Sequence, residues 1–244
     1  MKVLLVAGAR PNFMKIAPIY RESLKHGRVR CGIVHTGQHY DHEMSQAFLD
    51  DLGLPQPRFS LNAGSGSHAV QTARIMIAFE AVCEGEKPDL VVVVGDVNST
   101  LACSLTAKKL CIQVAHVEAG LRSFDLTMPE EINRKVTDSI SDILFATEAG
   151  AVQNLLAEGK PPERIHLVGQ VMIDNLFHQL QRLGSSACGE FPTAPLKQKL
   201  GRYLFLTLHR PANVDSGDRF LDCLLYTSDA ADDLLCVDLG GRRI

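Results

Sequence analysis

Short aliphatic runs separated by longer amphipathic segments constrain the fold of this chain more than any other feature. The runs that read as strands are Val3–Ala7, Cys31–His35, Leu90–Val94, Ile112–Val117, Ile143–Ala146 and Ile165–Val168. Helix-period patterns lie between them at residues 12–25, 42–52, 68–84, 99–109, 130–140 and 148–158. Because a strand that is covered on both faces is apolar throughout, this alternation predicts an α/β fold with a Rossmann-like, doubly wound parallel sheet.

The chain changes character after residue 170. A helical pattern at 171–183 is followed by a segment rich in Gly, Ser and Pro, and residues 203–208 then read as the first strand of a second sheet. The tail that begins CLLYTSDAADD resembles a translated sequencing adapter, so we expect it to be non-native. We predict an N-terminal Rossmann-like domain at 1–170, an interdomain helix and linker at 171–201, the start of a truncated second Rossmann-like domain at 202–222, and the tail at 223–244.

The composition argues against several classes of function. The 244 residues are 45 % hydrophobic and 22 % charged, enough to bury one sizeable core. The net charge is −3, and no basic run indicates a partner such as nucleic acid or an anionic membrane. No apolar stretch is as long as a membrane span, and Lys2 leads directly into a strand rather than a signal peptide. Seven scattered cysteines without CxxC spacing fit a reducing environment, so we expect a cytoplasmic protein.

The turn after the first strand carries the first candidate anion contacts. The sequence Gly8-Ala9-Arg10-Pro11 ends that strand and opens a helix, at the edge where parallel sheets bind ligands. Arg10 can grip a phosphate with two N–H groups, and Lys15 lies one turn into the helix. The turn lacks the G-x-G-x-x-G pattern of a dinucleotide site. Taken alone, it fits a tight turn with a solvated arginine equally well.

A carboxylate follows the next buried strand. Asp96 comes directly after the apolar run at 90–94, so it emerges at the ligand-binding edge. Its alternative role is to cap the helix that follows. Because Asn98 or Ser99 can perform that capping, the pattern favours a functional role for Asp96.

The strand at 112–117 delivers further polar groups to the same edge. His116 and Glu118 share one face by the two-residue period of a strand. Within a doubly buried strand they must pair with each other or with Arg122, or contact a ligand. Farther along, Glu130 and Glu131 stand in the first turn of a helix, a position that helix electrostatics alone would explain.

Three carboxylates, Asp96, Glu118 and Glu130, are therefore predicted to converge at one edge of the sheet. Clustered carboxylates can differ in proton affinity and so supply both an acid and a base. The nearby cations, which suit a diphosphate, are Arg10, Lys15, Arg122 and Arg134. A metal site would use Asp96, His116, Glu118 and His209. Their spacing matches no zinc or iron signature, so we expect no metal and no cofactor.

Six sequence blocks resemble the non-hydrolysing UDP-N-acetylglucosamine 2-epimerase family. In chain order they are GARPNFMKIAPI, HTGQHYDHEM, VVVVGDVNSTLA, HVEAGLRSFD, MPEEINR and LTLHRPANVD. The resemblance implies two Rossmann-like domains that face each other across a cleft in the GT-B arrangement, of which this chain holds the N-terminal half. One departure is Asn12, which stands where many relatives carry Glu.

The resemblance implies that UDP-N-acetylglucosamine is converted to UDP-N-acetylmannosamine by inversion at C2, without nicotinamide or an obligatory metal. A base removes the C2 proton while UDP leaves C1, and UDP then adds back to the 2-acetamidoglucal as a proton arrives on the opposite face. Matched residue by residue, the catalytic set is Asp96, Glu118, Glu130 and His209. The matched phosphate and substrate contacts are Arg10, Lys15 and Arg134. Gln38 and His39 resemble cleft-lining residues, and a simple loop role is the alternative. We add His116 and Arg122 as further substrate-binding candidates.

Other functions remain compatible with these residues. A hydrolysing 2-epimerase would release the free sugar, a GT-B glycosyltransferase would form a glycoside, and a non-catalytic nucleotide-sugar-binding module would not need the carboxylates. The resemblance suggests a homodimer. Because the family's nucleotide contacts lie mostly in the second domain, we expect the 244-residue chain to bind UDP-N-acetylglucosamine poorly and to turn over little.

Overall fold

The computed structural model describes residues 1–37, 48–185 and 193–201. The chain divides into two compact units, Met1–Ser186 and Ala187–Ile244. Within the second unit, the described residues form helix α8, Ala194–Leu200. The sheet and the site residues that the structure describes belong to the first unit.

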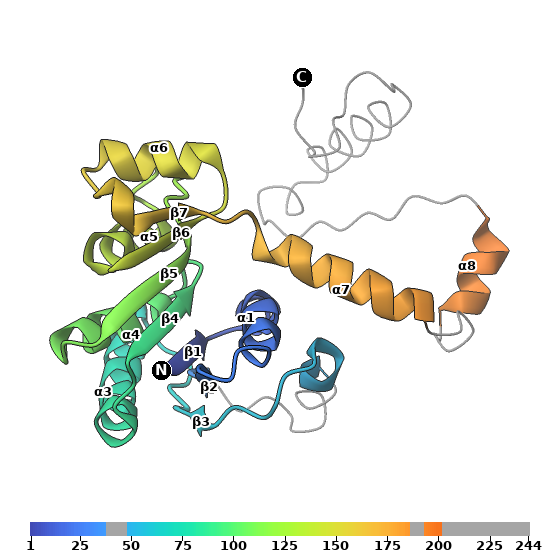
Figure 1. Cartoon of the computed structure of the whole chain (residues 1–244), viewed down its shortest axis with the longest axis horizontal. Helices are drawn as coiled ribbons and strands as arrows, with labels where there is room; N and C mark the ends of the chain where they lie inside the picture. Colours follow the sequence, from blue (N-terminus) through green and yellow to red (C-terminus); the bar gives the residue numbers. More distant parts are fainter. Residues whose placement is uncertain (38–47, 186–192, 202–244) are drawn as a thin grey trace. The chain divides into compact units, whose positions relative to one another are not determined.

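The first unit is built on one parallel sheet (Figure 1). Its strands, in the order in which they lie side by side, are β3 (Phe59–Ser60), β2 (Arg30–His35), β1 (Lys2–Ala7), β4 (Leu90–Val94), β5 (Gln113–Ala119), β6 (Ile143–Ala146) and β7 (Ile165–Leu167). The chain builds outward from β1 to one edge and then returns to build outward from β4 to the other. The order therefore reverses between β1 and β4, where Val3 pairs with Leu90 and Leu5 with Val92.

Helices cover both faces of the sheet. On one face lie α1 (Arg10–Ser23), the segment at 48–54 and α7 (Val171–Ser185). The other face is covered by α3 (His68–Glu86), α4 (Asn98–Lys109), α5 (Pro129–Ile140) and α6 (Ala149–Ala157), and the 3₁₀ turn Pro162–Arg164 leads into β7. The predicted Rossmann-like, doubly wound α/β fold is confirmed.

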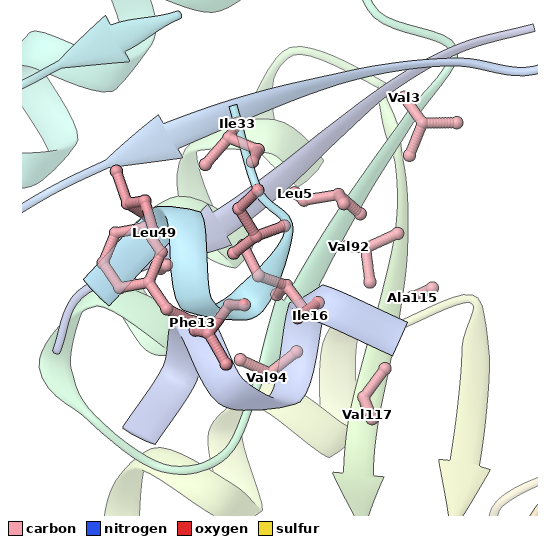
Figure 2. Close-up of a cluster of buried hydrophobic side chains, with 14 residues drawn as sticks. Val3, Leu5, Phe13, Ile16, Ile33, Leu49, Val92, Val94, Ala115 and Val117 are labelled. Atoms are coloured by element: carbon pink, nitrogen blue, oxygen red, sulfur yellow. The ribbon is translucent and has the colours of Figure 1, made fainter. Parts of the chain in front are cut away.

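Alternate residues of the central strands fill two separate cores, which explains why these strands read as continuous apolar runs. Val92 and Val94 of β4 pack on the α1 side, together with Phe13 and Ile16 of that helix (Figure 2). Val91 and Val93, which alternate with them along β4, point to the other face and pack against α3 and α4. Each fully buried side chain of this kind contributes roughly 1.5–3 kcal/mol by removal from water.

The sequence-based boundaries hold to within a few residues, with two differences. The two-residue strand β3 was not predicted, because so short a run has no period to detect. The predicted capping of the helix after β4 is wrong: α4 begins at Asn98, its N-cap is Val97, and no side chain caps it. Instead, the Thr100 hydroxyl donates to the Val94 carbonyl at 2.9 Å, tying the helix to the strand before it.

Several predictions fall on residues that the structure does not describe. These are the first part of the helix expected at 42–52, the domain start at 202–222 and the tail at 223–244; residues 48–52 are helical, as expected. Among the described residues, no helix has the length and apolar character needed to cross a membrane.

Helix α3 offers a matched pair of substitutions that tests the packing. Phe79 is wholly buried against the sheet, whereas Ile77 is 71 % exposed on the same helix. We expect Phe79→Ala to lower the free energy of unfolding by about 3–5 kcal/mol, because it leaves a cavity. Ile77→Ala should change it by less than about 0.5 kcal/mol. Urea denaturation followed by circular dichroism measures both, and equal losses would contradict this packing.

Candidate active site

The candidate site lies at the carboxyl ends of β1 and β4, where the strand order reverses. The turn Gly8-Ala9 leads from β1 into α1, and the turn at 95–97 leads from β4 into α4. At such a reversal the connecting loops on the two sides diverge toward opposite faces and leave a crevice in which ligands bind. Two stretches almost ninety positions apart in the sequence are brought together here by the pairing of β1 with β4.

An ion pair spans the edge of the sheet beside this crevice. The Lys15 ammonium of α1 lies 2.5 Å from the Glu118 carboxylate at the end of β5, and both side chains are largely buried. Gly95 lies against this pair with a left-handed backbone, φ +70°. A Cβ at position 95 would stand 3.0 Å from Lys15 Nζ and 3.7 Å from Glu118 Oε2. A glycine therefore lets the β4 turn pass close to the pair.

Glu118 itself has an unusual backbone. Its φ is +71°, and the pairing of β5 with β6 shifts register between Val117 and Ala119. Few residues other than glycine adopt this left-handed conformation, and those that do are held in it by their surroundings. Such a bulge re-aims a side chain at the end of a strand.

The bulge corrects one prediction from the sequence. His116 and Glu118 were expected to share a face of β5, but Glu118 contacts Lys15 on α1 while His116 contacts Asp138 on α5. The two helices cover opposite faces of the sheet. The simple two-residue alternation fails here because the left-handed residue interrupts it.

Asp96 is held by α5. Its carboxylate forms an ion pair with Arg134, and its backbone carbonyl accepts a hydrogen bond of 2.8 Å from the Asn133 side chain. The Asp96 side chain keeps 30 % of its surface exposed, so its carboxylate remains accessible to solvent. Arg134 also contacts Glu131 at 3.0 Å, which fixes the guanidinium between two carboxylates.

The two adjacent glutamates of α5 have different surroundings. Glu131 is wholly buried and accepts hydrogen bonds from the Ser123 amide (2.9 Å) and hydroxyl (3.0 Å). Burial alone would raise the pKa of Glu131, but the hydrogen bonds from Ser123 and Arg134 outweigh it and lower that pKa. Glu130 is partly exposed and makes no hydrogen bond or ion pair with any residue that the structure describes. Glu131 is therefore engaged in the fold, whereas Glu130 is available.

Arg122 lies in an ion-pair network rather than in the crevice. Its side chain is inaccessible to solvent and donates two hydrogen bonds to Glu158, at 2.9 and 2.6 Å, and contacts Asp138 at 2.8 Å. Burial opposes the charged form, but the hydrogen bond to Glu158 and the charge of Asp138 outweigh burial and raise the pKa of Arg122. In this arrangement its guanidinium is committed to protein carboxylates, which differs from the substrate contact predicted from the sequence.

His116 is also placed differently from its prediction. It is fully buried, with Nδ1 at 2.6 Å from the Asp138 carboxylate and Nε2 at 2.8 Å from the Gly95 carbonyl. Both ring nitrogens already have partners within the protein. His116 therefore takes the structural role that the sequence left open as an alternative, although its partner is Asp138 rather than Glu118 or Arg122.

The remaining predicted residues divide into two groups. Arg10 is the first residue of α1, is exposed, and has its guanidinium carbon 5.6 Å from the centre of the Phe48 ring. Gln38, His39 and His209 lie outside the described residues. Within residues 1–37, 48–185 and 193–201, no three His, Cys, Asp or Glu side chains gather so as to hold a metal ion.

Two residues of the site were missed by the sequence analysis. Asn12 is buried and bridges the two turns: its Oδ1 accepts from the Ala9 amide at 2.9 Å and its Nδ2 donates to the Val94 carbonyl at 3.2 Å. Its position three residues after the N-cap of α1 is a capping signal that could have revealed it. Asp138 left no such signal, because an acidic residue in an amphipathic helix reads as part of the solvated face.

A cavity elsewhere in the first unit contains none of the predicted site residues. Its volume is about 910 Å³, and its walls come mainly from α1, α7 and the sheet, with apolar side chains such as Val92, Val117 and Phe145. No cluster of carboxylates lines it. The charged residues at the carboxyl ends of β1, β4 and β5 are therefore the better candidates for chemistry.

The comparison with known families shows which family the chain belongs to. The family model described as UDP-N-acetylglucosamine 2-epimerase matches residues 21–237. The chain belongs to the UDP-N-acetylglucosamine 2-epimerase family. The match runs past residue 222, so it includes part of the segment that the sequence analysis set apart as a tail.

Relatives within this family show what the chain is similar to. A UDP-N-acetylglucosamine 2-epimerase homolog of Methanococcus maripaludis is 46 % identical over 215 residues, which are 88 % of this chain and 59 % of the relative. The UDP-2,3-diacetamido-2,3-dideoxy-D-glucuronate 2-epimerase of Pseudomonas aeruginosa is 42 % identical over 217 residues, with 88 % and 59 % covered. The chain thus spans about 59 % of the length of these relatives.

A solved structure agrees in fold. The Methanocaldococcus jannaschii UDP-GlcNAc 2-epimerase, in complex with UDP-GlcNAc and UDP, superposes with a TM-score of 0.77 at 42 % sequence identity. The match covers 95 % of this chain and 63 % of that one.

The buried Asp138 carboxylate generates a prediction about acid stability. Burial would raise its pKa, but the hydrogen bond and charge of His116 and the charge of Arg122 outweigh burial, so the pKa of Asp138 is lowered. A lowered pKa in the folded state contributes stability above about pH 4, and this contribution is lost as the pH falls through the folded-state pKa.

We therefore expect Asp138→Asn to lose less stability than the wild type between about pH 7 and about pH 2, because the amide has no charge to lose. Urea denaturation at both pH values measures this, with the exposed Glu163→Gln as control. If the free energy of unfolding fell equally for the variant and the wild type between the two pH values, the lowered pKa of Asp138 would be contradicted.

Proposed function

We propose that this chain supplies the catalytic carboxylates of a non-hydrolysing UDP-N-acetylglucosamine 2-epimerase, which interconverts UDP-N-acetylglucosamine and UDP-N-acetylmannosamine. One observation carries the proposal: Asp96 and Glu118, each paired with a cation, stand on neighbouring turns at the edge where the strand order reverses. Glu130, without a partner among the described residues, lies in the first turn of the helix that holds Asp96.

The reaction needs proton transfer at one carbon and stabilisation of a leaving diphosphate. A base takes the proton from C2, the C–H electron pair forms the C1–C2 double bond, and the C1–O bond breaks to release UDP. Return of UDP to C1 with delivery of a proton to the opposite face of C2 gives the epimer. Two proton-transferring groups must therefore flank the sugar ring, and carboxylates in different surroundings meet that need.

Cations beside these carboxylates suit the diphosphate. The Lys15 ammonium and the Arg134 guanidinium are already at the edge of the crevice, each within contact of one carboxylate. Arg10 stands at the start of α1, where the helix N-terminus also favours an anion. A diphosphate that binds here is stabilised by several positive charges throughout the reaction, which keeps the neutral intermediate from being lost to water.

The relatives narrow the substrate class. The Methanocaldococcus jannaschii neighbour was solved with UDP-GlcNAc, and the Pseudomonas aeruginosa relative acts on a UDP-linked diacetamido glucuronate. Both names describe a 2-acetamido sugar on UDP. We propose UDP-N-acetylglucosamine for this protein, in a GT-B arrangement with a second domain that carries His209 and most nucleotide contacts, acting as a cytoplasmic homodimer.

Product analysis tests the proposal. Two proteins would be incubated with UDP-N-acetylglucosamine: the 244-residue chain, and a chimera in which residues 1–201 are followed by the C-terminal part of the Methanocaldococcus jannaschii relative. We expect UDP-N-acetylmannosamine from the chimera and little or none from the 244-residue chain. Free N-acetylmannosamine with UDP would indicate the hydrolysing enzyme, and a glycoside formed with an acceptor would indicate a transferase. A folded chimera that binds the nucleotide sugar without changing it would be a binding module.

Single substitutions in the chimera test the roles of the carboxylates. We expect Asp96→Asn, Glu118→Gln and Glu130→Gln each to lower kcat by about 100-fold or more, the usual contribution of an acid or base. The control is Glu86→Gln, because Glu86 forms ion pairs with Lys2 and Arg58 at the opposite end of the strands. The proposal would be wrong if all three carboxylate variants kept the rate of this control.

A further inference from the structure

The turn after β4 and the bulge at the end of β5 both contain left-handed residues. Gly95 has φ +70°, Glu118 has φ +71° and Gly120 has φ +81°. This conformation is sterically unfavourable for Glu118, because its Cβ comes close to the neighbouring backbone. Contacts that hold these residues must therefore come from the structure around them.

One buried pair of side chains, His116 and Asp138, contacts both the turn after β4 and the bulge of β5. His116 Nε2 lies 2.8 Å from the carbonyl of Gly95, directly before Asp96. On the other side of the ring, Nδ1 lies 2.6 Å from Asp138 Oδ1, and Asp138 Oδ2 accepts the Gly120 amide at 3.0 Å, two residues beyond Glu118. Both side chains are fully buried. The Gly95 amide also donates to the Val117 carbonyl at 3.1 Å. Both backbone groups of Gly95, its amide and its carbonyl, are therefore hydrogen-bonded.

The hydrogen-bonding groups define where the protons lie. The Gly95 carbonyl can only accept, so His116 Nε2 donates. Asp138 Oδ2 accepts from the Gly120 amide and from Arg122, and an ionised carboxylate also accepts at Oδ1, so Nδ1 donates as well. A ring that donates from both nitrogens is an imidazolium, and its charge is balanced by Asp138.

We propose that Asp138 and His116 are positioning residues for the epimerase reaction, acting as an imidazolium–carboxylate pair that fixes the Asp96 turn to the Glu118 bulge. The spacing of the two reacting carboxylates then depends on a group that touches neither the sugar nor the diphosphate. The reaction part of this inference rests on the proposed function, whereas the charge state of the pair does not. Misplacing a reacting group by about 1 Å is enough to lower a rate by about 100-fold.

The charge state can be measured on the 244-residue chain by ¹⁵N NMR of the histidine rings. We expect both ring nitrogens of His116 to be protonated at neutral pH in the wild type. In Asp138→Asn the ring should become neutral with its proton on Nε2, because the amide can donate to Nδ1. A wild-type ring with one unprotonated nitrogen would overturn the imidazolium.

The positioning role is tested by the kinetics of three variants in the chimera. We expect Asp138→Ala to lower kcat by about 100-fold with KM changed by less than about threefold, because binding groups stay in place. Asp138→Asn should recover at least about tenfold of that loss, since an amide can replace the hydrogen bonds. The matched control is Asp142→Ala, because Asp142 accepts from the Val114 amide and Lys108 at the start of β5, away from the site.

A second variant guards against misfolding of Asp138→Ala. His116→Phe keeps Asp138 paired with Arg122 and Gly120 and removes only the tie to Gly95, so kcat should fall by about tenfold or more. If both Asp138→Ala and His116→Phe matched Asp142→Ala in kcat, the positioning role would be wrong. A folded wild-type chimera that forms no UDP-N-acetylmannosamine would instead overturn the proposed function, and the NMR result would still decide the charge state.

Discussion

The pairing of β1 with β4 is the constraint on which the rest of this structure depends. Because β1 and β4 are parallel neighbours, the turns after residues 7 and 94 lie at the same edge of the sheet. Both strands are buried on both faces, so their positions are fixed by the two apolar cores rather than by the polar residues that follow them. The fold thus holds a polar edge on a rigid apolar base, which suits catalysis that relies on fixed charges.

The charged groups at this edge form two layers. The outer layer is formed by Lys15, Asp96 and Arg134, whose side chains are 16–30 % exposed, and by Glu118, which is 8 % exposed. Behind them, Asp138, His116 and the Arg122 side chain are closed to solvent. Carboxylates and cations are paired in both layers, so each buried charge in them has a counter-charge, and the more exposed layer can exchange partners with a ligand.

Much of this arrangement could be predicted from the sequence, and the reasons for success and failure are physical. The strands that are apolar on both faces predicted the parallel sheet. The position of Asp96 and Glu118 directly after two of these apolar runs predicted the edge at which they lie. The orientation of His116 could not be predicted, because one left-handed residue at the end of β5 breaks the alternation. The structural role of Asp138 could not be predicted, because its partners Gly120 and His116 lie 18 and 22 positions earlier in the chain. The distinct surroundings of Glu130 and Glu131 depend on Ser123, which only the tertiary structure brings to the helix.

The backbone at position 118 has a consequence for how this protein can change. Glycine or asparagine would adopt φ +71° at a lower steric cost than glutamate, but neither could keep the ion pair with Lys15. Removing that carboxylate would leave a largely buried ammonium without its counter-charge. The backbone and the side chain therefore set opposing demands at position 118, and few residue types can meet both.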